Sequence, residues 1–151
     1  MLQPSKKTLF AIEAVLDIAY HAGGEPVQSR EITRRQGIPH RYLEQTLQHL
    51  VRSGILTGVR GPKGGYRLAR ERRRISIGEI IRTIRAQEAA EEAPEEMPGS
   101  ELGLQVIRPV WQELQNEIMQ RLDSITIDDL CMRAYQQGIV SEITQKMDFA
   151  I

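Results

Sequence analysis

Residues 55–70 read Ile-Leu-Thr-Gly-Val-Arg-Gly-Pro-Lys-Gly-Gly-Tyr-Arg-Leu-Ala-Arg, two short apolar runs around a glycine-rich centre. The β-branched, aromatic and aliphatic residues of 55–59 and 66–68 favour strands, whereas the Gly and Pro residues between them favour a turn. This pattern predicts a β-hairpin whose tip carries Arg60 and Lys63. Because the tip residues are small, its backbone amides can approach an anionic surface closely, and nucleic acid is the obvious surface of that kind.

The composition places this hairpin in a mostly helical protein. The chain has 151 residues, 40% of them hydrophobic, which suits one domain or a small domain with an added element. Most apolar residues are Leu, Ile and Ala at helical spacing, so the predicted fold is mostly α with a small β-hairpin wing. No apolar run approaches the roughly 18 residues of a membrane span, and the N-terminus lacks the apolar core of a signal peptide. We therefore expect a cytoplasmic protein without a membrane partner.

Charge is segregated along the chain although its formal net charge is zero. Residues 1–85 contain 16 Lys and Arg against 7 Asp and Glu, a net charge of +9, and residues 86–151 contain 4 against 13, a net charge of −9. A basic block of this density is the electrostatic footprint of a nucleic-acid surface. The N-terminal half is therefore predicted to bind the partner.

Three helices are predicted before the hairpin. The first begins after Ser5 as N-cap and ends near Ala22, and its apolar face is expected to contain Leu9, Ile12, Val15, Leu16 and Ala19. The second is expected to be capped by Ser29 and to end at Gly37, with Ile32 buried.

The third helix is predicted to start at Pro39 and to end at Gly54, with Leu43, Leu47, Leu50 and Val51 facing inward. Together with the second helix it forms a candidate helix-turn-helix. Its outward side then consists of residue types that can discriminate base edges in a major groove: His40, Arg41, Glu44, Gln45, Gln48 and Arg52. Tyr42 is placed to reach a phosphate. Taken alone, such a face could equally be solvated; followed by a basic hairpin, it indicates a winged helix-turn-helix.

Beyond the hairpin the chain changes character twice. Ser76 and Glu79 match a capping box, with Ile75 and Ile80 placed as a hydrophobic staple, so a fourth helix is predicted there. Residues 88–101 contain six glutamates and two prolines, and almost nothing large to bury, which predicts an acidic flexible loop.

Helical spacing returns after this loop. Pro109 either kinks the new helix or marks where its regular part begins. The apolar stripe is predicted to pack against a second copy of the chain through Ile107, Trp111, Leu114, Ile118 and Leu122. Thr126 and Asp129 form a weaker capping pair for a last helix ending at Gly138, and the remaining residues are either a short helix or a loose tail.

The predicted organisation therefore has four parts. Residues 1–86 form a winged helix-turn-helix domain, 87–101 an acidic loop, 102–138 a dimerisation helix with a short helix after it, and 139–151 a C-terminal tail.

Several of these motifs together resemble the Rrf2 family of bacterial transcription regulators: Tyr42-Leu43-Glu44-Gln45, Gly54-Ile55-Leu56, residues 60–69 of the hairpin and Ile77-Gly78-Glu79-Ile80-Ile81. The match weakens in the C-terminal half, where residues 111–114 and 125–130 resemble that family's long helix and the segment after it. The resemblance implies a homodimer, expected to act as a repressor, on a partly palindromic double-stranded DNA operator. It also implies major-groove contacts by Arg41, Tyr42, Glu44 and Gln45. The wing tip would then lie in or over the minor groove, through Arg60, Pro62 and the tip glycines, which include Gly64 and Gly65, with Lys63 as a further predicted DNA contact.

Many members of that family sense through an iron-sulfur cluster held by three cysteines in the loop before the long helix. This chain has one cysteine, Cys131, which lies beyond that helix, and Gln105 and Arg108 stand near the helix start. His40 and His49 are out of phase on one helix, and His21 is distant. We therefore expect no metal site and no cluster. A small-molecule or protein effector, or control by the regulator's own abundance, remains open.

The sequence also bears on two other classes of function. The winged helix could serve as a protein-interaction module without specific DNA binding, with the acidic loop or the long helix as its docking surface. An enzyme is not expected: residues 61–65 do not match a phosphate-binding P-loop, because no Ser or Thr follows the lysine, and no spacing suggests a catalytic set.

Overall fold

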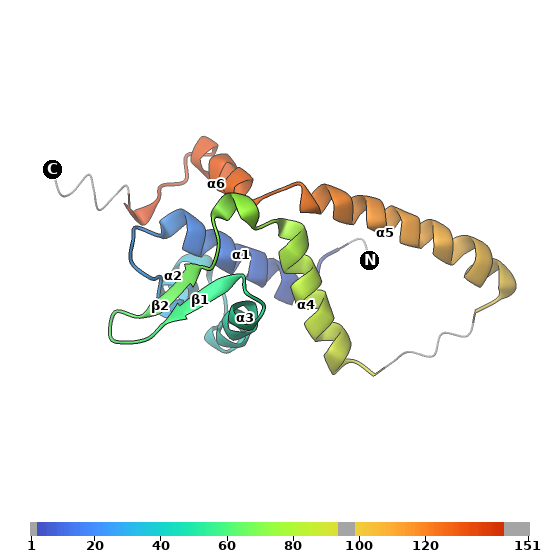
Figure 1. Ribbon diagram of the computed structural model, residues 1–151, viewed down its shortest axis with the longest axis horizontal. Coiled ribbons are helices and arrows are strands. Elements are labelled where there is room, and N and C mark those ends of the chain that lie inside the picture. Colours follow the sequence, from blue (N-terminus) through green and yellow to red (C-terminus); the bar gives the residue numbers. More distant parts are fainter. Residues whose placement is uncertain (1–2, 94–98, 144–151) are drawn as a thin grey trace.

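The computed structural model describes residues 3–93 and 99–143 (Figure 1). Four helices and a hairpin form its N-terminal body: α1 (Lys6–His21), α2 (Ser29–Gln36), α3 (His40–Arg52), β1 (Leu56–Val59), β2 (Gly65–Leu68) and α4 (Ile77–Glu91). A short 3-10 turn, η1 (Arg72–Arg74), precedes α4. The C-terminal part contains a π-helical turn η2 (Gly103–Ile107), α5 (Arg108–Asp123) and α6 (Ile127–Gln136). The fold is therefore mostly α with a small hairpin, as predicted.

Side-chain caps fix where the helices begin. Ser5 Oγ accepts the amide of Thr8 at 3.2 Å at the start of α1, as predicted. At α6, Thr126 and Asp129 exchange both bonds of a capping box, at 3.1 and 2.9 Å. These reciprocal bonds satisfy amides that a helix end leaves without partners.

The cap of α2 differs from the prediction. Ser29 is the first helical residue rather than the cap, and the preceding Gln28 forms a capping box with Glu31 instead. The Glu31 carboxylate accepts the Gln28 amide at 3.0 Å. Ser or Thr usually fills the position that Gln28 occupies here. The preference for Ser as a cap therefore led to Ser29, one residue after the observed cap.

Helix α4 begins as predicted but runs further. Ser76 Oγ accepts the amide of Glu79 at 3.1 Å, whereas the Glu79 carboxylate pairs with Arg70 rather than returning to the helix start. The helix continues to Glu91, so the first residues of the expected acidic loop are helical. Residues 94–98 of that loop lie outside the described residues.

Helix α1 lies at the centre of the core. It contacts α2, α3, α4, α6 and β2, so it is buried on more than one side. Its fully buried residues are Ala11, Ala14, Val15 and Ile18. The predicted single apolar face is therefore partly wrong: Ile12, Leu16 and Ala19 are partly buried, and Leu9 is 43% exposed.

The wing is an antiparallel pair in which Leu56 lies opposite Leu68 and Val59 opposite Gly65. Val27, just before α2, adds a third short segment to this sheet. Its backbone N–H donates to the Tyr66 carbonyl at 2.9 Å, and the Tyr66 N–H donates to the Val27 carbonyl at 2.8 Å.

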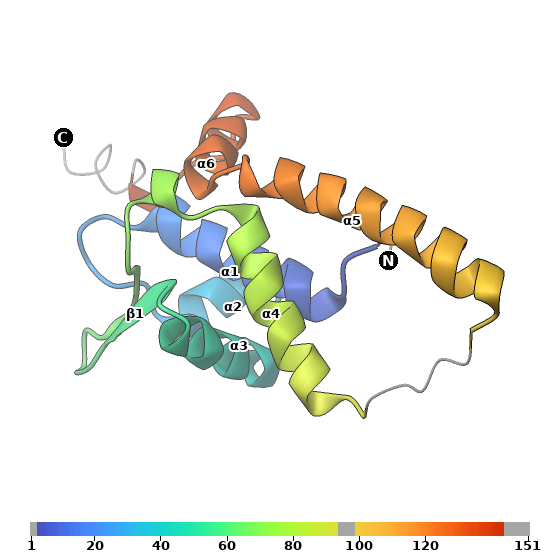
Figure 2. The same ribbon diagram turned by 45° about the vertical axis from the view of Figure 1, so that its right-hand side comes forward.

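Helix α5 runs away from the body, and its N-terminal half extends beyond α1 to α4 in both views (Figures 1 and 2). The helix is continuous through Pro109: the Arg108 N–H bonds to the Gly103 carbonyl five residues back, and regular α-helix starts at Arg108. This π turn lets the chain accept a proline without breaking the helix. Two backbone bonds hold the chain just after α5 beside the start of α4. The Ile77 N–H donates to the Ile125 carbonyl at 2.9 Å, and the Ile127 N–H donates to the Ile75 carbonyl at 2.8 Å. None of the helices in residues 3–93 and 99–143 is long and apolar enough to cross a membrane.

Candidate nucleic-acid interface

The outward face of α3 is set by what the helix buries. Leu43, Leu47 and Leu50 are fully buried, and Thr46 is nearly so. The opposite side therefore presents Tyr42, predicted to reach a phosphate, and all of the predicted base-reading residues to solvent: His40, Arg41, Glu44, Gln45, Gln48 and Arg52. The turn before α3 is equally well anchored, because Ile38 is fully buried and Gly37 adopts φ 68°.

Glu44 connects this face with the wing. The imidazole of His40 lies 3.3 Å from the Glu44 carboxylate, one helical turn away. On the wing, burial and the nearby negative charge of Glu44 raise the pKa of the Tyr66 hydroxyl. The first turns of α3 and strand β2 are thus close enough to interact electrostatically.

The tip of the wing is a tight turn. The Gly64 N–H donates to the Gly61 carbonyl at 2.9 Å, with Pro62 and Lys63 at the two central positions. Gly61 has φ 111°, a conformation that L side chains rarely adopt. Arg60, Pro62 and Lys63 are exposed, so both cations are presented at the outer end of the hairpin.

Gly64 and Gly65 are half-buried, and the hairpin itself explains why both are glycine. A Cβ on Gly64 would lie under 3.0 Å from the Val59 carbonyl, and a Cβ on Gly65 under 3.0 Å from the Val27 carbonyl. Both neighbours are backbone atoms that cannot rotate away. Contact of these two glycines with DNA stays a prediction, whereas their need for close backbone packing follows from the geometry.

Gln28 also belongs to this surface, and it is not among the residues predicted from the sequence. Its Nε2 donates to the Pro62 carbonyl at 3.4 Å, a weak bond, while Arg30 Nε donates to its Oε1 at 2.7 Å. One side chain therefore links the start of α2 to the wing tip. The available signal was the Gln-x-x-Glu spacing of residues 28–31, which can form a capping box but is less recognisable than one beginning with Ser or Thr.

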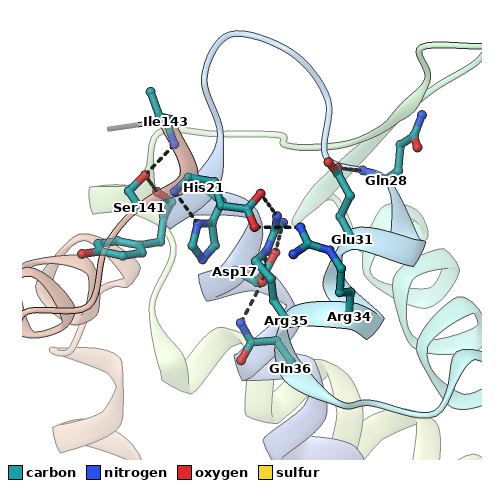
Figure 3. A network of polar contacts seen from close by, with 11 residues as sticks. Asp17, His21, Gln28, Glu31, Arg34, Arg35, Gln36, Ser141 and Ile143 are labelled. Atoms are coloured by element: carbon teal, nitrogen blue, oxygen red, sulfur yellow. Dashed lines mark hydrogen bonds and ion pairs between the residues drawn. The ribbon is translucent and has the colours of Figure 1, made fainter. Parts of the chain in front are cut away.

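A buried ion pair fixes α2 against α1 (Figure 3). The Asp17 side chain is fully buried and receives two bonds from the Arg35 guanidinium, at 2.9 and 2.8 Å. Gln36 Nε2 donates to the same carboxylate at 2.7 Å. A bidentate pair with an additional donor satisfies a buried carboxylate well. The first helix of the helix-turn-helix is consequently held at a defined angle to the core.

The chain after α6 adds a second layer to this ion pair. Residues 139–143, here called the return segment, pass over the end of α1. Glu142 accepts bonds from Arg34 and Arg35, each at 2.7 Å, and its backbone N–H donates to His21 Nδ1 at 3.1 Å. Ser141 Oγ donates to the Tyr20 carbonyl at 2.9 Å. Of the tail expected at 139–151, these residues are ordered against α1 and α2; residues 144–151 lie outside the described part.

These charges move two pKa values. Burial, together with the positive charge of Arg35, lowers the pKa of His21. Burial opposes ionisation of Glu142, but Arg34 and Arg35 outweigh it and hold the pKa of that carboxyl below its ordinary value. At neutral pH, His21 therefore accepts the amide proton as a neutral ring, and Glu142 pairs as a carboxylate.

The predicted dimerisation stripe is solvent-facing in the single chain. No residue of α5 is buried, and Trp111 is 44% and Ile118 49% exposed; Ile107 and Leu114 are also exposed, whereas Leu122 is half-buried. Beside the C-terminal half of this stripe lies a hollow of about 340 Å³ between α1, α4 and α5. Its apolar lining consists of Leu9, Ile12, Ile77, Ile81, Ile118 and Leu122.

The described residues do not offer a cluster site. No group of three or more His, Cys, Asp or Glu within residues 3–93 and 99–143 could hold a metal ion. Cys131 is buried in α6, where burial raises the pKa of its thiol. The His49 ring is also engaged, because its Nε2 lies 3.1 Å from the Thr83 carbonyl oxygen, within hydrogen-bond distance. A protein with a single cysteine cannot supply the three thiolates of a cysteine-held cluster.

Comparisons with known proteins agree on one family. The Rrf2 profile, described as an iron-dependent transcriptional regulator, matches residues 4–133. The transcriptional regulator IscR of Vibrio cholerae is 33% identical over 146 residues, covering 95% of this chain and 81% of IscR. Protein rrf2 of Nitratidesulfovibrio vulgaris is 31% identical over 125 residues, covering 82% of this chain and 83% of the relative.

Solved structures are similar over nearly the whole chain. IscR of T. potens superposes with a TM-score of 0.74 at 35% identity, covering 93% of both chains. CymR, the global cysteine regulator of B. subtilis, superposes with a TM-score of 0.70 at 28% identity, covering 88% of this chain and 98% of CymR.

Proposed function

The chain belongs to the Rrf2 family of DNA-binding transcription regulators, and we propose that it is a repressor that binds a partly palindromic operator as a homodimer. Each protomer would place the exposed face of α3 in a major groove and the tip of the wing in the adjacent minor groove. The observation that carries this proposal is that the helix-turn-helix and the wing are joined: Gln28 at the start of α2 bonds to the wing tip, and the Glu44 charge of α3 is close enough to raise the pKa of Tyr66 on β2.

Within this interface we assign different tasks to the side chains. Glu44, Gln45 and Arg41 are exposed, and their functional groups match the hydrogen-bonding edges of cytosine, adenine and guanine. His40, Tyr42 and Gln48 flank them on the same helix. Arg60 and Lys63 stand at the end of the wing, where a cation contributes by pairing with phosphate or by entering a narrow minor groove.

The homodimer is supported by the unpartnered stripe on α5. An apolar row extending beyond its own body must be covered if the protein is to stay soluble. In a two-fold dimer both subunits use the same surface. We propose that the outer half of each α5, including Trp111, lies against the body of the other subunit. The apolar hollow of about 340 Å³ formed by Leu9, Ile12 and their neighbours offers a surface for such an insertion.

The signal that controls the regulator is proposed to be read without a cysteine-held cluster. The family profile is described as iron-dependent, but the ligand set this chain offers does not fit such a group. Iron analysis and an absorption spectrum of protein purified without oxygen test this directly. Stoichiometric iron with a visible cluster spectrum would contradict the proposal.

DNA binding is tested with a duplex from the promoter region of the protein's own gene. The logarithm of the affinity should fall steeply and linearly with the logarithm of salt concentration, since phosphate contacts release counterions. Arg60→Ala should weaken binding, whereas Glu13→Gln, an exposed change on α1 away from the interface, should leave it unaltered. Salt-independent affinity, or capture of a protein partner with no binding to any promoter duplex, would instead favour a protein-interaction module.

A further inference from the structure

A second hollow lies beside α6, and its lining includes the buried core residue Cys131. It has a volume of about 520 Å³ and lies between α6 and the return segment, with Tyr20 of α1 and Arg72 of η1 at its edges. Four large apolar side chains that are otherwise exposed converge on it: Met132, Tyr135, Ile139 and Val140. Tyr135 alone is 75% exposed, so the surface keeps considerable apolar area in contact with water. Volumes of this size are typical of small-molecule sites.

The walls of the hollow are held in place by bonds that tie α1 to the return segment, without involving the apolar side chains of Met132, Ile139 and Val140. Gly138, with φ 77°, ends α6 and turns the chain back. The Tyr20 hydroxyl donates to the Ile139 carbonyl, and Ser141 Oγ donates to the Tyr20 carbonyl at 2.9 Å. The cavity is therefore formed by the fold itself, and a ligand would not have to order the walls.

The charge of the lining selects the kind of ligand. Among the lining residues Arg72 is the one charged side chain. Its Nε pairs with Asp128 at 2.7 Å, and this bond orients the guanidinium. A guanidinium positioned at the edge of an apolar cavity favours a carboxylate or another planar anion over a cation or a neutral alcohol.

We propose that this hollow binds a small amphipathic anion, an apolar body lying against Met132 and Val140 with its acidic group at Arg72. The return segment that forms one wall also anchors Arg34 and Arg35 of α2 through Glu142. Occupancy of the hollow and anchoring of the helix-turn-helix therefore favour the same arrangement of residues 139–142. Ligand binding should consequently tighten operator binding, a coupling that rests on the proposed function.

Binding is tested without DNA, using the fluorescent anion 8-anilinonaphthalene-1-sulfonate as the probe. Decanoate should displace the probe more effectively than decanol or decyltrimethylammonium, because only decanoate combines an alkyl chain with a negative charge. Met132→Glu should weaken probe binding by about tenfold or more, since it places a like charge beside the ligand. Gln136→Glu adds the same charge to an exposed position of α6 outside the lining and should change binding little.

Leu9→Glu tests whether the probe binds instead in the apolar hollow beside α5. Because Leu9 lines that hollow and not the proposed site, this variant should leave the displaceable probe fluorescence unchanged. Equal probe binding by the Met132 and Gln136 variants, or equal displacement by all three competitors, would overturn the proposed site. The coupling has its own readout: decanoate should raise operator affinity in the wild type and not in Glu142→Gln, which still binds the probe. Probe binding with no change in operator affinity would overturn the coupling alone. Absence of operator binding would count against the proposed function while leaving the ligand site standing.

Discussion

Val27 and Tyr66 exchange two backbone hydrogen bonds, at 2.9 and 2.8 Å, and thereby join the segment before α2 to the second strand of the wing. The helix-turn-helix and the hairpin are therefore not independent elements connected only through α3. Their relative position is set by backbone bonds, which side-chain changes on the DNA-facing surface do not disturb.

Gly65→Ala is expected to disrupt this junction. The new methyl group would lie under 3.0 Å from the Val27 carbonyl, so the strand or the segment before α2 must move. Overpacking of this kind costs about 1–3 kcal/mol, and operator affinity should fall together with the urea midpoint. Gly58→Ala is the matched control in the same hairpin, since a Cβ there meets nothing within 4 Å. Comparable losses in both variants would contradict the role assigned to the junction.

The hairpin illustrates how far sequence reasoning reaches. Its strands and turn follow from local chemistry, because Gly and Pro at fixed positions leave few alternatives to a tight turn. The bridge to Val27 could not be predicted, since one residue carries no strand signal and its partner is 39 positions away. The same holds for Leu9. Periodicity placed it on the predicted apolar face of the first helix, but the packing of α1 against several neighbours decides which residues of that face are fully buried.

The candidate site divides in a similar way. The exposed side of α3 was predictable because Leu43, Leu47 and Leu50 must face the core. Gln28 and the Asp17–Arg35 pair were not predicted, because their effect depends on contacts between elements rather than on spacing within one. Asp17 stands in a helix as an ordinary acidic residue, and nothing in the surrounding sequence reveals that its side chain is fully buried.

Base preference should separate the helix from the wing. Glu44→Ala or Gln45→Ala should relax discrimination at individual base pairs by about 1–3 kcal/mol, because each removes a group suited to a base edge. Lys63→Ala should weaken binding to all sequences alike and reduce the slope of the salt dependence. Titrations against single-base operator variants and random DNA distinguish these outcomes. Equal effects of the three changes on operator and random DNA would refute the assignment.

Trp111→Glu should dissociate the proposed dimer, because it places a charge in the centre of the apolar stripe on α5. Sedimentation velocity should show a shift to the monomer at concentrations where the wild type is dimeric, with helix content retained since Trp111 is already 44% exposed in the single chain. Gln120→Glu adds a charge to an exposed position of the same helix outside the stripe. A dimer that survives Trp111→Glu, or that is lost equally with Gln120→Glu, would place the interface elsewhere.

Arg35→Met should be strongly destabilising, because among the described residues it leaves the fully buried Asp17 carboxylate with the Gln36 amide as its remaining hydrogen-bond donor. Removing one member of a buried pair costs about 3–5 kcal/mol. Arg34→Met is the matched control: Arg34 is 63% exposed and shares Glu142, so its loss should cost about 0–1 kcal/mol. Urea denaturation measures both. Similar midpoints for the two variants would show that the Asp17 pair does not stabilise the fold.

Acidification should lower stability in two stages. The pKa of His21 is lower in the folded chain, so below about 6.5 the unfolded chain binds this proton first and the folded state loses stability as pH falls. The pKa of Glu142 is also lowered by folding, and its contribution is lost at more acidic pH, as pH falls through the folded value. His21→Gln keeps an acceptor for the Glu142 amide but does not titrate.

Urea midpoints measured across the acidic range should therefore show a shallower first stage in His21→Gln than in the wild type. The second stage should persist in this variant and diminish in Glu142→Gln. An unchanged pH profile in both variants would mean that these two groups do not control the acid sensitivity of the fold.

The return segment has a consequence for the order of folding. Tyr20 and Ile139 are 119 residues apart, and Ser141 and Glu142 contact residues of α1 at a separation of 121. Contacts that close loops of this length carry a large entropic cost and are made late, after the local helices have formed. We therefore expect residues 139–143 to close onto α1 after the local helices have formed, and their amides to exchange with deuterium sooner than those of α1.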